Sequence, residues 1–92
     1  MKPLFTLGQL VATPGALKEI EASGDSLSTY LARHQSGDWG DVDAHDRNEN
    51  QLSLEQGFRL MSVYTLNIRG VKIWVIREAD RSSTCILLPE EY

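Results

Sequence analysis

The fold is decided by a stretch in the C-terminal half of the chain, which reads RLMSVYTLNIRGVKIWVIREADRSSTCILL over residues 59–88. Three runs rich in β-branched and aromatic residues occupy 59–66, 71–78 and 83–88, a composition typical of β-strands. The short segments between them, 67–70 and 79–82, have the composition of turns. We therefore predict three consecutive strands joined as an antiparallel meander.

The turn lengths also predict the register of the meander. The first hairpin pairs Tyr64 with Ile73, and the second pairs Val75 with Ile86. Side chains alternate between the two faces of a strand, so this register assigns each residue to a face. The side that we call the inner face is predicted to form the core, and it carries Leu60, Ser62, Tyr64, Leu66, Val71, Ile73, Val75, Ile86 and Leu88.

The opposite side, which we call the outer face, is too apolar to be left in water. It carries Met61, Val63, Thr65, Lys72, Trp74, Ile76, Cys85 and Leu87. An exposed apolar patch usually marks an interface. The N-terminal segment is one candidate to cover it, and the other is a second copy or a protein partner that docks on Trp74 and Ile76.

The first half of the chain has helical patterns. Thr13 and Pro14 predict the start of a helix, and this helix ends near Gly24. A second helix is expected from residue 25 or 26 to Gly37. A third, mostly solvated helix is predicted from about 42 to 56, whereas 5–12 is either a short strand or irregular. The predicted class is α+β: one domain in which two or three N-terminal helices pack on a three- to four-stranded antiparallel meander.

Composition narrows the range of functions. The chain has 92 residues, a net charge of −4 and a single cysteine, so no internal disulfide forms. No apolar run is long enough for a membrane span, and the start lacks a signal-like apolar segment, so we expect a cytoplasmic protein. The acidic balance does not favour a nucleic-acid partner.

The densest polar segment is RHQSGDWGD over residues 33–41. A histidine at a helix end, next to a glycine-rich loop that carries Asp38 and Trp39, suits general acid–base chemistry or ligand binding. The alternative is structural, because His34 continues the helical stripe of Leu27, Tyr30 and Leu31. Both interpretations of His34, Asp38 and Trp39 stay open at this point.

Two further segments carry residues of the kinds that bind phosphate or metal ions. Arg81 lies in the last turn and Thr84 just after it, where a basic residue beside hydroxyls could bind phosphate, although the pattern also fits a surface turn. Residues 41–52 lack the glycine and glutamate that a calcium loop requires. A metal site that uses His34, Asp38 and His45 is the third hypothesis, although no ligand spacing fixes it. No phosphate or dinucleotide fingerprint is present, so we expect neither metal nor cofactor.

Two motifs carry a family resemblance. They are RHxxGDWG at 33–40 and WxIxExDRSxTxILLPEEY at 74–92, and together with intervening positions they cover about residues 7–92. The chain resembles a family of small bacterial proteins described as plasmid-related and found near mobile elements. The family has no established activity, so the resemblance implies an association with mobile elements but no mechanism. Arg77 departs from the pattern, which more often has an uncharged polar residue there. The apolar outer face favours a non-enzymatic accessory or protein-interaction module.

A weaker likeness is topological. Helices followed by a meander are similar to the small ribonuclease folds of barnase and the RelE-type toxins. That likeness implies His34 as general acid or base, Arg81 as the phosphate-binding residue, and Tyr64 and Thr84 as assisting groups. An RNA endonuclease is therefore the alternative function, although no catalytic motif aligns with these residues.

Overall fold

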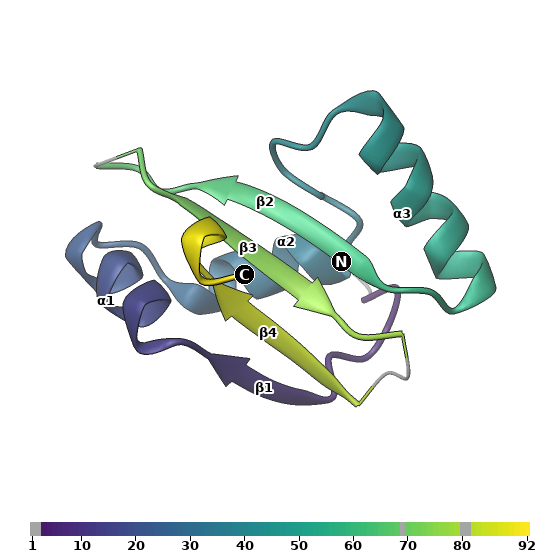
Figure 1. The fold of residues 1–92 in the computed structure, drawn as a ribbon, viewed down its shortest axis with the longest axis horizontal. Helices are drawn as coiled ribbons and strands as arrows, with labels where there is room; N and C mark the ends of the chain where they lie inside the picture. The colour runs from purple at the N-terminus through teal and green to yellow at the C-terminus, as the bar shows by residue number, and fades with distance from the viewer. Residues whose placement is uncertain (1–2, 69, 80–81) are drawn as a thin grey trace.

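The structure is a computed structural model, and it describes residues 3–68, 70–79 and 82–92. A four-stranded sheet forms the centre of the molecule, with helices on one side and at one edge (Figure 1). The elements follow one another as β1 (Gln9–Ala12), α1 (Pro14–Ala22), α2 (Leu27–Gln35), α3 (Ala44–Gln56), β2 (Leu60–Thr65), β3 (Lys72–Arg77), β4 (Ser83–Leu87) and the 3-10 turn η1 (Pro89–Glu91).

The predicted meander is confirmed, and so is its register. Strands β2, β3 and β4 pair antiparallel, with Tyr64 opposite Ile73 and Val75 opposite Ile86. The prediction of a purely antiparallel sheet is wrong, because β1 joins as a fourth strand parallel to β4. The strand order is β1-β4-β3-β2, so the helices lie between strands in the sequence instead of preceding all of them.

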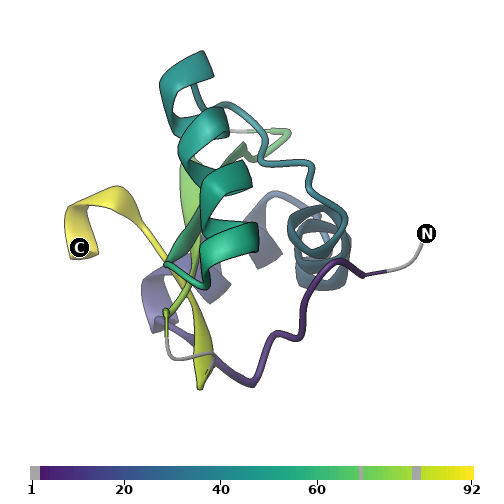
Figure 2. The ribbon, with the colours of Figure 1, turned by 90° about the vertical axis from the view of Figure 1, so that its right-hand side faces the viewer.

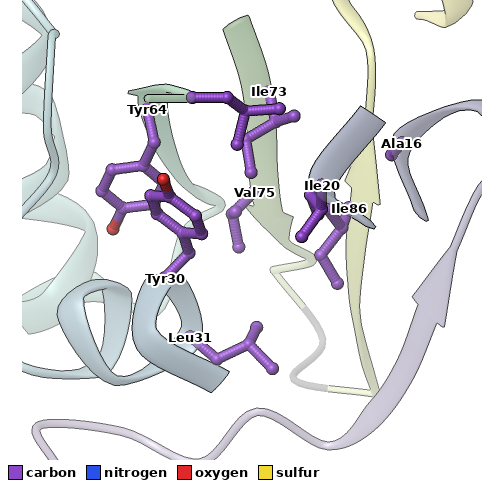
Figure 3. Packing of buried hydrophobic residues seen from close by; sticks show 9 residues of the cluster. Ala16, Ile20, Tyr30, Leu31, Tyr64, Ile73, Val75 and Ile86 are labelled. Atoms are coloured by element: carbon purple, nitrogen blue, oxygen red, sulfur yellow. The ribbon is translucent and has the colours of Figure 1, made fainter. Parts of the chain in front are cut away.

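The core lies between the inner face and the first two helices (Figure 3). Helix α1 begins at the predicted cap, where the Thr13 hydroxyl accepts a hydrogen bond from the Ala16 backbone N–H at 3.1 Å. The apolar stripes of α1 and α2 then face the sheet, as their helical spacing predicts. The buried members of this cluster are Ala16, Ile20, Tyr30, Leu31, Tyr64, Leu66, Ile73, Val75 and Ile86.

Helix α3 packs beside the free edge of β2 and does not cover the inner face (Figure 2). The residues that it buries are polar, Asn50 and Ser53, which explains why its apolar stripe is weak. Gly57 ends the helix with a φ of 79°, a conformation that favours glycine.

The outer face is partly covered by the chain's own C-terminus. The turn η1 lies on the side of the sheet opposite α2 (Figure 2) and contacts β3. The rings of Trp74 and Tyr92 are 5.3 Å apart. Neither cover that the sequence suggested, the N-terminal segment or a second copy, is needed to bury Ile76, which is 3% exposed. Within the described residues, no helix combines the length and apolar character that crossing a bilayer requires.

Candidate functional site

His34, the main candidate for acid–base chemistry, is fully buried against the inner face. Its Nδ1 lies 2.5 Å from the hydroxyl of Ser62 on β2, and its ring meets the rings of Phe5 and Trp39 edge-on. Nε2 is also buried and has no hydrogen-bond partner among the described residues. The helical stripe therefore carries His34 into the core, which is the structural interpretation of this residue.

This environment keeps the His34 imidazole neutral. Burial lowers the pKa of His34 from 6.5 to about 4, and the positive charge of Arg77 adds to the effect. Arg77 is itself buried, donates from Nε to the Thr6 carbonyl at 2.8 Å, and lies over the Phe5 ring. A neutral, enclosed histidine beside a buried cation lacks the near-neutral pKa that a general base needs.

Asp38 and Arg33 form the polar centre of the loop after α2. Arg33 donates from Nε and Nη2 to the two Asp38 carboxylate oxygens at 2.7 and 3.3 Å, and its guanidinium lies 4.6 Å from the Tyr64 ring centroid. These hydrogen bonds hold the pKa of Asp38 below its usual range. The Tyr64 hydroxyl donates to the Asp38 carbonyl at 2.7 Å, so this cluster ties the loop to the sheet.

The next two residues of the motif attach the loop to the edge of β2. Trp39 is 4% exposed and packs with Val42 and Val63, so its ring belongs to a second buried cluster. Gly40 forms an isolated parallel bridge with Val63. A Cβ at Gly40 would lie 2.0 Å from the Val63 carbonyl oxygen, so only glycine fits.

Among the described residues, the candidates of the ribonuclease-like interpretation are buried and form no accessible site. Thr84 is fully buried and donates its hydroxyl to the Leu7 carbonyl at 2.7 Å. Tyr64 is 1% exposed, and burial raises the pKa of its phenol. Arg81 lies outside the described residues.

The candidates of the docking interpretation divide into two kinds. The side chain of Trp74 is half-buried on the outer face and contacts Tyr92, whereas the side chain of Ile76 is closed off within the chain. Ile76 is 3% exposed and lies between Met61 and Cys85 of the neighbouring strands.

The residues of the metal hypothesis lie apart. His45 projects from α3 into solvent near Glu49, whereas His34 is in the core and Asp38 is paired with Arg33. Across 3–68, 70–79 and 82–92, no group of three or more potential metal ligands converges, and no pocket is found.

Asn50 has a structural role that sequence reasoning did not predict. Its side-chain amide donates to the Met61 carbonyl at 2.8 Å and accepts from the Met61 N–H at 3.1 Å. In this way one side chain takes the place of a neighbouring strand along β2. The sequence signal that points to such a role is a polar residue in a helix that has few apolar residues to bury.

Comparison with known proteins adds no family to this description. A scan against protein-family models gave no match, and searches of curated proteins and of solved structures gave no significant match.

Proposed function

We propose that this chain is a non-enzymatic protein-interaction module that docks a protein partner through the outer face of its sheet. One observation carries the proposal: a strip of apolar side chains stays accessible there although η1 covers part of the face. Val11 is 46% exposed and Tyr92 is 67% exposed, while Cys85, Met61 and Trp74 are half-buried.

The strip follows one row of the outer face, with the buried Ile76 between Cys85 and Met61. Val11 pairs with Cys85, and Cys85 pairs with Ile76, so their side chains form one row. Trp74 lies on the same face of β3, two residues before Ile76, and its ring contacts the ring of Tyr92. Large aromatic side chains with a polar rim are typical of protein interfaces, and Arg59, which donates to the Tyr92 hydroxyl at 2.6 Å, supplies such a rim.

The polar candidates support a binding role over the RNA endonuclease alternative. The Thr84 hydroxyl and the His34 Nδ1 are engaged by other groups of the same chain, and both residues are fully buried. A general acid or base must lie within hydrogen-bond reach of its substrate. The resemblance to plasmid-related proteins supports the further proposal that the partner belongs to the machinery of a mobile element.

The test is a native pull-down with the purified chain as bait, followed by binding of each captured protein in purified form. We expect a direct partner whose binding is lost with Trp74→Glu and Tyr92→Glu. Leu52→Glu is the matched control, because Leu52 is 44% exposed on α3. Circular dichroism must show that all three variants fold.

Two results would contradict the proposal. One is a direct partner that binds native protein, Trp74→Glu and Tyr92→Glu equally well. The other is cleavage of single-stranded or structured RNA by the purified protein that disappears in both His34→Ala and Thr84→Val, which would establish the enzymatic alternative.

A further inference from the structure

The two edges of the sheet differ in whether they can accept another strand. The order β1-β4-β3-β2 makes β1 and β2 the edge strands. An edge strand presents unpaired N–H and C=O groups, and these pair with a strand from another molecule unless something blocks them.

The β2 edge is blocked by the chain itself. Besides the Asn50 amide on Met61, the Val63 N–H donates to the Trp39 carbonyl at 3.0 Å, and the Val63 carbonyl accepts from the Asp41 N–H at 2.7 Å. The outward backbone groups of both Met61 and Val63 are thus satisfied. An incoming strand has no ladder to extend there.

The β1 edge is open. The Gln9 N–H donates to the carbonyl of Ser82, the residue before β4, and the Thr13 N–H donates to the carbonyl of Ile86 in β4. Both distances are 3.0 Å. Alternation along a parallel ladder then directs the N–H and C=O of Leu10 and Ala12 away from β4. Figure 1 shows no other helix or strand along that side of β1.

The open edge is also uncharged and apolar. No charged residue occurs from 3 to 17 in a chain whose net charge is −4. Leu10 is 49% exposed on one side of β1, and Val11 is 46% exposed on the other. Protective lysines or inward charges, which usually keep edge strands apart, are missing from β1.

We infer that β1 pairs antiparallel with β1 of a second copy of this chain, which joins the two sheets into one. Two copies with the same negative charge repel least where neither carries charge. A two-fold pairing uses the same edge of both copies. Because the β2 edge is closed, growth stops at the dimer and does not continue into a filament.

The open backbone groups define the register of this pairing. Leu10 lies opposite Ala12 of the partner subunit, so that their outward N–H and C=O groups bond to each other. Val11 then meets Val11 of the partner subunit at the two-fold axis, in a position where opposed side chains are close. A four-residue strand gives an interface below about 1,200 Å², so the dimer is transient.

The test combines sedimentation velocity over a concentration series with amide hydrogen exchange on the native protein. We expect reversible dimerisation, and Val11→Lys should raise the dissociation constant by about tenfold or more, since it opposes two like charges. Leu52→Lys, which adds the same charge on α3, should leave it unchanged. Thermal melting shows whether each variant folds.

Hydrogen exchange needs no variant. In the dimer the Leu10 and Ala12 amides become protected as concentration rises, whereas the Val11 amide, already bonded to β4, is protected at every concentration. Concentration-independent exchange at Leu10 and Ala12 overturns the inference, as does a monomer at all concentrations. A dimer that Trp74→Glu abolishes and Val11→Lys leaves intact also overturns it, while supporting docking through the outer face.

Discussion

Gly40→Ala tests the attachment of the loop after α2 to the sheet. Gly40 has a φ of 76°, and an added Cβ would lie 2.0 Å from the Val63 carbonyl oxygen and 2.6 Å from the Tyr64 ring. The left-handed conformation costs a residue with a Cβ roughly 1–2 kcal/mol. Overpacking costs about 1–3 kcal/mol, and each backbone bond lost at Val63 about 0.5–1.5 kcal/mol.

Together these effects should lower the free energy of unfolding by about 4 kcal/mol or more, a large share of the ~5–15 kcal/mol typical of native proteins. Urea denaturation followed by tryptophan fluorescence measures the loss directly, because Trp39 precedes the glycine. Gly24→Ala is the matched control: Gly24 has a φ of 71° but no atom within 4 Å of the added Cβ. The reasoning is refuted if both variants lose the same stability.

Two further predictions follow from buried polar groups. Because the pKa of His34 is about 4 in the folded chain and 6.5 ordinarily, the free energy of unfolding should fall by up to roughly 3 kcal/mol as pH drops from 6.5 to 4. Denaturation at several pH values checks this, and a fall of the same size in His34→Gln would assign the effect to other groups. Asn50→Leu should cost about 2–3 kcal/mol, since both backbone groups of Met61 lose their partner. Asn50→Asp keeps only the acceptor, so its stability should lie between that of the native protein and that of Asn50→Leu. Thermal melting measures both variants, and a neutral effect of Asn50→Leu contradicts the role of Asn50.

Contacts within the chain explain why the 33–41 segment suggests chemistry yet has structural partners. Each of its distinctive residues has a structural partner: Arg33 pairs with Asp38, His34 faces Ser62, and Gly40 approaches Val63. A histidine and an aspartate near glycines have the same sequence signature in a catalytic loop and in a loop fixed to a sheet. Only the burial of His34 and the direction of Asp38 separate the two interpretations.

The sequence by itself determined the meander and its register, and it placed Tyr64 and Val75 on the buried side. These features depend on turns of a few residues and on the period-two alternation of side chains, which are local. It also determined the three helices, through caps such as Thr13 and Gly57.

Only the tertiary structure decided the rest. The parallel pairing of β1 with β4, and contacts such as that between Leu7 and Thr84, 77 residues apart, join segments that no local pattern links. The contact of the C-terminal Tyr92 with Trp74 and the closure of the β2 edge by Asn50 arise in the same way. Such contacts depend on which surfaces meet after the local elements have formed, and a single sequence does not encode that choice in any short-range pattern.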